Sequence, residues 1–243
     1  MNGVEISARF ALPPNSREYC GVGSFAETFS RFLKNKSKPN ARALEKSLSS
    51  FKAHYAYLSL IAKKNGKSPF DRGVAEAFWI GSLLLAKVKR NDLQGLIAGK
   101  FCGRGLLSEQ KAARLASAVQ SGHVAHHSFH TMHIHTITGV IAPTVANADK
   151  CRVSWGMVLK AGTGWVEVLA QKLAKRKGKL VLLPCRRRWR TYCAGISLVP
   201  DAKKGDFVAA HWGVAVMGIS ARQRAWLKRA TLRNMAAENS LAR

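Results

Sequence analysis

The sequence predicts an α+β fold in which an N-terminal helical bundle precedes a small closed β-barrel and a C-terminal helix. In the first half of the 243 residues, apolar side chains recur near a 3.6-residue period. After about residue 130, short runs rich in Val, Ile, Thr and aromatic residues alternate with Gly and Pro. We therefore expect a helical domain with a histidine-rich end over residues 1–145. A barrel domain with the final helix should cover residues 146–243.

Four helices are predicted in the first half. The first covers Leu44 to Ile61, and the Asn65-Gly66 pair ends it. The second begins near Ser68 and the third near Asn91. The fourth begins at Ser108, whose hydroxyl can cap a helix that carries an acidic residue in its first turn. Short loops between helices of this length favour a small orthogonal bundle.

The second half should consist mainly of short strands. Residues alternate in type from Ile134 to Val140, and a small-residue link over residues 143–149 marks the domain boundary. Strands are then expected at Arg152–Lys160, Trp165–Gln171, Lys179–Leu183, Thr191–Leu198 and Phe207–Ile219. Ser220 should cap the final helix.

The chain is strongly basic but not disordered. It has 40 Lys and Arg against 13 Asp and Glu, a net charge of +27, yet 47% of its residues are hydrophobic. Such a charge attracts polyanions, acidic protein surfaces or anionic lipids.

Targeting signals and cysteine usage predict a cytoplasmic protein without a membrane span. The first ten residues lead into no apolar signal segment, and the longest apolar run, Ala77 to Leu85, is far shorter than the roughly 20 residues that a span requires. The five cysteines form no C-x-x-C pair, which favours reduced thiols.

No sequence pattern points to catalysis. A nucleophile elbow, a phosphate-binding P-loop and a dinucleotide fingerprint are all missing from the sequence. With 13 acidic residues, a pair of catalytic carboxylates is also improbable. We therefore expect a protein that is not an enzyme.

Six of the eight histidines fall within thirteen residues. On a helix, five of them would share one side at spacings of three and four, which allows two imidazoles to bind one metal ion. The alternative is that these histidines pack, cap helix ends and bond to the backbone. The candidate metal ligands of this segment are His123, His126, His127, His130 and His133.

Two segments of the C-terminal half carry a family resemblance. The first contains Cys151, Gly156 and Val158, and the second contains Gly205, Asp206, Val208, His211, Gly213 and Ala215. Over residues 150–238 the chain thereby resembles the HypC/HupF family of small nickel–iron hydrogenase maturation chaperones. In that family the cysteine follows the initiator methionine, whereas Cys151 is internal.

The resemblance implies an OB-like barrel and a metal-assembly role. It implies that Cys151 supplies a thiolate ligand and that His211 is a second ligand or orients one. The cargo would be iron with diatomic ligands, or nickel. The partner would be a hydrogenase large-subunit precursor or a maturation scaffold, bound through an acidic surface. In the alternative interpretation, Cys151 is a buried structural thiol and His211 lines the barrel and bonds to the backbone.

The N-terminal half has a resemblance of its own. Ala8–Asn15, Tyr19–Gly21, Asp71–Trp79 and His127–His130 are similar to a bacterial and archaeal family of unknown function that joins such a helical half to the HypC-like half. This resemblance implies that the two halves belong together, and it assigns no reaction.

Nucleic-acid binding is the alternative function. Eight of the sixteen residues from 175 to 190 are Lys or Arg, and aromatic residues lie nearby, as in barrels that bind single strands. The alternative is that this segment is a solvent-exposed basic hairpin with no role in nucleic-acid binding. The candidate nucleic-acid contacts are Lys175, Arg176, Lys177, Arg186, Arg187, Arg188, Trp189 and Arg190.

Overall fold

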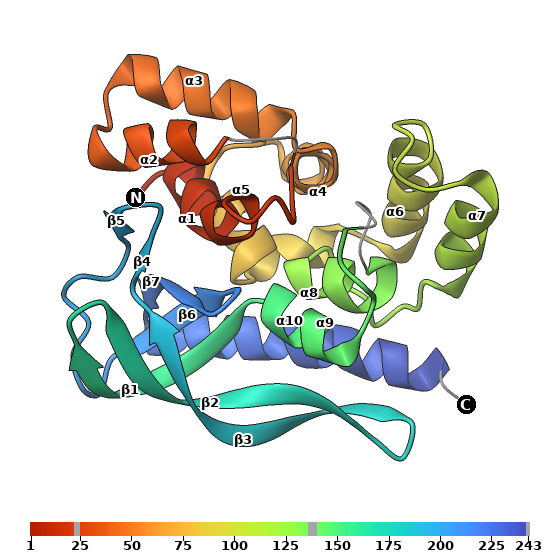
Figure 1. Cartoon of the computed structure of the whole chain (residues 1–243). Coiled ribbons are helices and arrows are strands. Elements are labelled where there is room, and N and C mark those ends of the chain that lie inside the picture. Colours follow the sequence, from red (N-terminus) through yellow and green to blue (C-terminus); the bar gives the residue numbers. More distant parts are fainter. Residues whose placement is uncertain (22–24, 136–139, 242–243) are drawn as a thin grey trace.

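The computed structural model describes residues 1–21, 25–135 and 140–241, and it confirms an α+β fold. Helices of the first half lie above a mixed sheet of five strands, and a long C-terminal helix runs beside the sheet (Figure 1). The helices before the sheet are α1 (Gly3–Asn15), α2 (Ala26–Lys34), α3 (Lys38–Ser49), α4 (Lys52–Asn65), α5 (Arg72–Trp79), η1 (Leu83–Lys87), α6 (Arg90–Gly95), η2 (Leu96–Phe101), α7 (Glu109–Ala118), α8 (His127–Phe129), η3 (His130–Ile134) and α9 (Val145–Cys151).

The predicted helix boundaries are confirmed in part. Gly66 ends α4 in the left-handed conformation (φ 64°), and the Ser108 hydroxyl accepts a hydrogen bond from the Lys111 amide at the start of α7. The single helix expected over Leu44 to Ile61 is wrong, because the chain breaks into α3 and α4 at residues 50–51. The buried Phe51 ring fills the corner between them and packs against Phe29.

Helix α1 lies at the centre of the molecule. Twelve of its thirteen residues are buried. It contacts α5 on one side and strands β6 (Phe207–His211) and β7 (Val214–Ile219) on another. A helix enclosed on all sides needs no polar face, so α1 shows no amphipathic pattern.

The strand order of the sheet is β1-β2-β3-β7-β6, and β6 also pairs with β1, so the sheet closes on itself. Its first three strands are β1 (Ser154–Gly162), β2 (Trp165–Arg176) and β3 (Lys179–Arg190). All neighbours are antiparallel except β3 and β7. The expected fourth strand is instead a separate hairpin of β4 (Tyr192–Cys193) and β5 (Ile196–Ser197). The single strand expected over Phe207–Ile219 is also wrong, because the chain turns after His211 and forms the antiparallel pair β6 and β7.

Two hydrophobic cores stabilise this arrangement. One lies inside the sheet and includes Val168 and Trp189. The other is continuous from the helices to the outer face of the sheet, and includes Phe10, Trp79 and Val216. Helix α10 (Ala221–Leu241) contacts α8, η3, β3 and β7. The two halves of the chain therefore pack against each other through a shared core.

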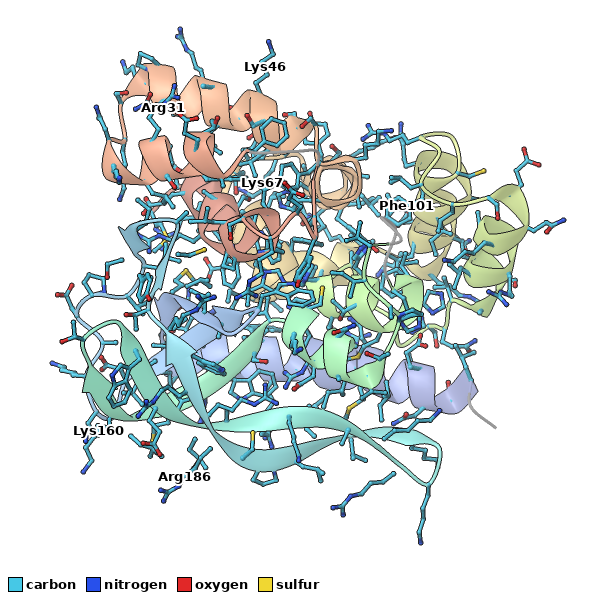
Figure 2. All side chains as sticks on the ribbon, viewed as in Figure 1. Arg31, Lys46, Lys67, Phe101, Lys160 and Arg186 are labelled. Atoms are coloured by element: carbon cyan, nitrogen blue, oxygen red, sulfur yellow. The ribbon has the colours of Figure 1, made fainter. Side chains whose placement is uncertain are left out.

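Three further expectations concern the middle and the surface of the chain. The expected link over residues 143–149 is largely helix α9, and most of the predicted alternation from Ile134 to Val140 lies outside the described residues. None of the described helices is long and apolar enough to cross a bilayer. The basic side chains labelled at the periphery, such as Lys46 and Arg186, point away from the fold (Figure 2).

Candidate metal centre

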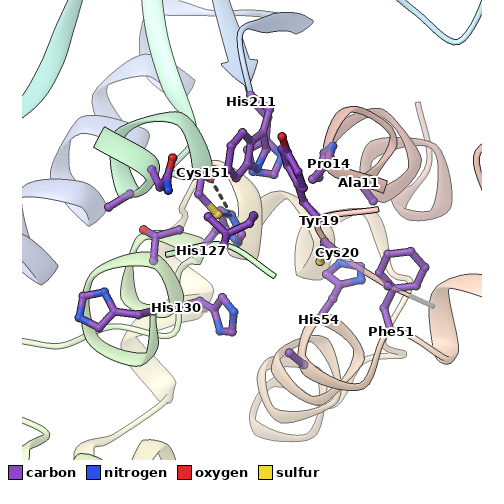
Figure 3. A pocket seen from close by; sticks show the side chains of 18 of the residues that line it. Ala11, Pro14, Tyr19, Cys20, Phe51, His54, His127, His130, Cys151 and His211 are labelled. Carbon is purple, nitrogen blue, oxygen red and sulfur yellow. Dashed lines mark hydrogen bonds between the residues drawn. The ribbon is translucent and has the colours of Figure 1, made fainter. Parts of the chain in front are cut away.

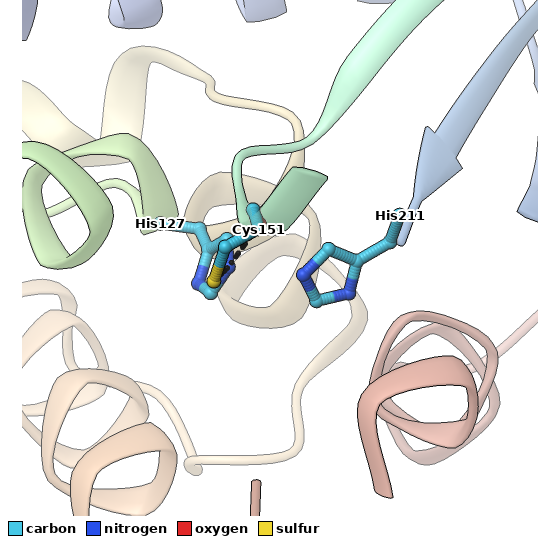
Figure 4. A group of neighbouring side chains, drawn as sticks. All are labelled: His127, Cys151 and His211. Carbon is cyan, nitrogen blue, oxygen red and sulfur yellow. Dashed lines mark hydrogen bonds between the residues drawn. The ribbon is translucent and has the colours of Figure 1, made fainter. Parts of the chain in front are cut away.

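Cys151 and His211, the two predicted ligands of the C-terminal half, lie together with a third residue, His127. They come from the end of α9, the end of β6 and the start of α8 (Figure 4). One ligand atom from each residue lies within 4.8 Å of the others. Sγ of Cys151 is 3.9 Å from Nε2 of His127. The fold thus brings three metal-binding side chains from distant segments to one point.

A tight turn fixes the position of His211 relative to Cys151. Strand β6 ends at His211, and Trp212 and Gly213 both adopt positive φ values of 51° and 75°. Two consecutive left-handed residues make the narrow connection typical of twisted antiparallel hairpins. The Trp212 amide donates to the carbonyl oxygen of Lys150 over 2.9 Å, so the turn is bonded directly to the last residues of α9.

Hydrogen bonds set the protonation of both histidines. Nδ1–H of His211 donates to the Phe10 carbonyl oxygen over 2.6 Å, and its buried Nε2 makes no regular hydrogen bond within the described chain. Nε2–H of His127 donates to the Cys151 carbonyl oxygen over 3.0 Å, and its buried Nδ1 has no partner there either. For His211 this is the usual arrangement around a ligating histidine, because the N–H bonded to a carbonyl leaves Nε2 with a free lone pair. For His127, the nitrogen 3.9 Å from Sγ of Cys151 is the one that bonds the carbonyl.

Burial keeps all three side chains uncharged at neutral pH. It lowers the pKa of His211 to about 4 and the pKa of His127 well below its ordinary value. It also raises the pKa of the Cys151 thiol to about 12, and the nearby Cys20 adds to this effect. The imidazoles are therefore ready to donate lone pairs, whereas a metal ion must displace the thiol proton.

The donor set fits a transition metal. Bonds of about 2.0–2.3 Å place two donors on one ion at most about 4.5 Å apart. Cys151 and His127 meet this limit, and the other separations, all within 4.8 Å, require only small side-chain rotations. Ligation by Nε2 of His127 would replace its bond to the Cys151 carbonyl. One thiolate and two imidazoles suit iron, nickel, copper or zinc.

A cavity of about 250 Å³ adjoins these three residues (Figure 3). Its walls are mostly apolar, and they also include Cys20, His54 and His130. Both ring nitrogens of His54 are buried without a partner in the described chain, and burial lowers the pKa of His54 to about 3. The cavity is therefore a largely uncharged chamber with space beside a bound ion for a further ligand.

Trp79 forms one wall of this chamber. Its ring centroid lies 4.5 Å from that of His127, 5.5 Å from that of His211 and 5.3 Å from that of His54. The indole thereby holds three imidazoles in fixed orientations. The residues 71–79 were expected to matter through family resemblance alone, and no periodicity indicates this packing role.

The structure divides the predicted histidine cluster. His126 bonds to Ser128 and to the Trp79 carbonyl oxygen, so both of its ring nitrogens are engaged. His130 lines the cavity, and its Nδ1 lies 3.5 Å from the Tyr57 hydroxyl. Only His127 of the cluster joins Cys151 and His211. The sequence spacing favoured none of the five candidate histidines over the others.

His123 and His133 form a second group with Glu238 of α10. Nδ1 of His133 is 2.6 Å from Oε1 of Glu238, and its Nε2 is 2.8 Å from the Leu115 carbonyl oxygen. Both ring nitrogens of His133 thus face an oxygen atom. His123 accepts from the Gln120 amide at Nδ1, and its Nε2 lies 2.9 Å from Oε1 of Glu238. This group is best described as a hydrogen-bonded ion pair; sequence analysis missed Glu238, which lies 105 residues beyond His133.

The basic segment is the β2–β3 hairpin, and its residues differ in exposure. Trp189 is only 3% exposed and packs inside the sheet, so it cannot stack on a base, contrary to expectation. Arg187 is half-buried and pairs with Asp149. Arg188 is exposed, and its guanidinium lies 4.1 Å from the Trp165 ring centroid. The remaining candidates are exposed at the hairpin: Lys175, Arg176, Lys177, Arg186 and Arg190.

Comparison with known proteins identifies a family and no function. No curated protein and no solved structure gives a significant match. The sequence model of the Family of unknown function (DUF6390) matches residues 1–243, which confirms the expected family of unknown function and gives no evidence for a HypC-like half. The helices and the closed sheet that together build the Cys151 site therefore belong to one family, and the chain is a member of the family of unknown function DUF6390.

Proposed function

We propose that the protein is a metal-binding accessory protein that assembles a metal centre, and that it holds its cargo through Cys151, His211 and His127. The observation that carries this proposal is the convergence of these three side chains beside a cavity. His211 keeps a buried lone pair on Nε2 and is oriented by the Phe10 carbonyl, whereas His127 would exchange its bond to the Cys151 carbonyl for a bond to the ion.

The resemblance to the HypC/HupF chaperones supports a role in assembling a metal centre. In this proposal the closed sheet is an OB-like barrel, the cargo is iron with diatomic ligands or nickel, and the client is a hydrogenase large-subunit precursor or a maturation scaffold. Three protein ligands hold an ion less completely than the four of a structural site, so the ion can leave. The protein's net charge of +27 favours a client with an acidic surface.

Metal binding by purified protein tests this proposal. Anaerobic titration with Ni²⁺ and Fe²⁺ should give about one bound ion per chain. Cys151→Ser and His211→Gln should each weaken binding by about 100-fold or more, since each removes a direct ligand. Cys102→Ser is the matched control, because Cys102 is a free thiol outside the cavity lining. Equal affinity in Cys151→Ser and the wild type would refute the site.

Client binding tests the accessory role separately. A pull-down from cells grown anaerobically should recover a hydrogenase precursor or a maturation scaffold with the wild type, and less of it with Cys151→Ser. Recovery of neither protein, from cells shown to contain both, would remove the hydrogenase assignment and leave a metal-binding protein.

The alternative function is single-strand nucleic-acid binding by the β2–β3 hairpin. The contact of Arg188 with Trp165 is the observation that favours it, because it forms an exposed cation–aromatic platform. Oligonucleotide affinity should then fall steeply as salt rises. Triple replacement of Lys175, Arg176 and Lys177 by Gln should weaken it further. The absence of measurable oligonucleotide binding at moderate salt would exclude this function.

A further inference from the structure

A second hollow lies on the other side of Tyr19 and Trp212 from the metal centre. Its volume is about 420 Å³, and both aromatic residues also line the first cavity. The ring centroids of Tyr19 and Trp212 are 4.7 Å apart, so the two rings form a common wall. A hollow of this size falls in the range of small-molecule sites, which run from about 300 to 1,000 Å³.

Positive side chains surround this second hollow. Arg17, Lys150, Arg187 and Arg188 line it, against Asp149 as the one acidic lining residue in the described chain. Asp149 is itself neutralised, because Arg152 and Arg187 both pair with it. Three cations, Arg17, Lys150 and Arg187, therefore line a space whose one carboxylate in the described chain is already paired, whereas the Arg188 guanidinium lies over the Trp165 ring.

The cations reach the hollow from three separate elements. Arg17 follows α1, Lys150 belongs to α9, and Arg187 and Arg188 belong to β3. Nη1 of Arg17 donates to the Trp212 carbonyl oxygen over 2.9 Å, which holds this guanidinium beside the aromatic wall. Lys150 and Arg188 form no ion pair with any described residue.

Several features distinguish this arrangement from the general basic surface. Arg187 is only 27% exposed, and its pairing with Asp149 fixes the position of its guanidinium. Two positioned guanidinium groups can each offer paired N–H donors to the oxygens of a tetrahedral anion, while an ammonium adds a point charge. The aromatic wall then provides an apolar surface next to the charged group.

We propose that this second hollow binds the phosphate group of a small phosphate monoester, with the organic part of the ligand against Tyr19 and Trp212. The three cations Arg17, Lys150 and Arg187 match a dianionic phosphate, and the open side of the hollow admits the rest of the molecule. This site is separate from the metal ligands and does not depend on a bound ion.

Titration calorimetry of metal-free protein at 150 mM salt tests the proposal. The probes are inorganic phosphate, ribose 5-phosphate and ribose. Ribose 5-phosphate should bind saturably with one site per chain, and ribose should not bind. The double variant Arg17→Gln/Lys150→Gln should bind ribose 5-phosphate at least about tenfold more weakly, because it loses two charged donors.

A control variant with the same change in net charge distinguishes binding at this hollow from the general attraction of anions to a basic protein. Lys177→Gln/Lys179→Gln also removes two exposed cations of the protein, but from the tip of the β2–β3 hairpin, at least eight residues along the chain from Arg187 and outside the hollow. It should change affinity by less than about twofold, since charges more than about 8 Å away are screened at this salt concentration. Circular dichroism of both double variants checks that they are folded.

Three outcomes would overturn the proposal. The first is the absence of saturable binding of both phosphate and ribose 5-phosphate. The second is an equal loss of affinity in the two double variants, which would indicate a diffuse field. The third is tighter binding of an oligonucleotide without terminal phosphates, with the same sensitivity to Arg17 and Lys150, which would indicate an extended strand as the ligand.

Discussion

Trp212, beside the candidate metal centre, has an unfavourable backbone conformation. Its φ of 51° lies in the left-handed region, which costs a bulky residue about 1–2 kcal/mol. Glycine or asparagine would avoid that cost. The side chain explains its presence, because it donates a hydrogen bond toward the Cys151 sulfur and separates the two hollows.

Trp212→Phe should therefore weaken metal binding while the fold is retained. Phenylalanine keeps most of the aromatic surface but lacks the indole N–H, which stabilises the thiolate form of Cys151. We expect a loss of about three- to tenfold in metal affinity, equivalent to about 0.7–1.4 kcal/mol for one hydrogen bond. Competition with a chelator measures it, and Trp165→Phe is the control. Unchanged affinity would contradict this role.

Metal affinity should rise with pH through the protonation of Cys151. The pKa of this thiol is about 12, so between pH 6 and pH 9 one proton must leave when the ion binds. His211, with a pKa of about 4, is already neutral throughout that range. The affinity should increase about tenfold per pH unit, which is the value for one displaced proton.

Chelator competition at four pH values gives the slope directly. The slope should disappear in Cys151→Ser, which has no thiol proton to release. A wild-type affinity that does not change from pH 6 to pH 9 would show that the thiolate is not a ligand.

At the scale of elements, the sequence predicted the strands more accurately than the helices. Most expected strands are present, because Gly and Pro punctuate them and alternating residues face the two sides of the closed sheet. Helix α1 was not predicted, because a helix buried on all sides has no polar stripe. The break between α3 and α4 was missed because Phe51 continues the apolar period while its backbone leaves the helix.

Helix α10 is attached to the rest of the protein partly through the contacts of its Glu238 with His123 and His133. Burial opposes ionisation of Glu238, but hydrogen bonds from His123 and His133 outweigh it and lower its pKa to about 2. Because the folded pKa lies below the unfolded value, this carboxylate stabilises the fold above about pH 4.5, and the contribution is lost as pH falls toward 2.

Glu238→Gln should lower the free energy of unfolding at pH 7 by about 2–4 kcal/mol, because it removes the ionised carboxylate whose pKa the fold lowers to about 2. Urea denaturation measures the change, and the exposed Glu109→Gln is the control, with an expected change below about 0.5 kcal/mol. The difference between Glu238→Gln and the wild type should shrink below pH 4. A constant difference down to pH 2.5 would contradict the assigned ionisation.

At the scale of the whole molecule, the candidate site exists only because the two halves of the chain pack together. His127 belongs to the helical half, and Cys151 and His211 belong to the half that contains the sheet. Motifs in the sequence could identify Cys151 and His211, since both fall within the resemblance to one family. They could not select His127 from its neighbours, because that choice depends on how α8 lies against α9 and β6.

Metal binding should consequently stabilise both halves together. An ion that binds only the folded state at 100 times its Kd adds about 2.7 kcal/mol to the free energy of unfolding. Because its ligands lie on α8, α9 and β6, hydrogen exchange should slow in all three segments at the same metal concentration. Cys151→Ser should show no such slowing, and Cys102→Ser should respond like the wild type. Protection confined to α9 and β6 would mean that His127 is not a ligand, and the ion would then be held by the C-terminal half alone.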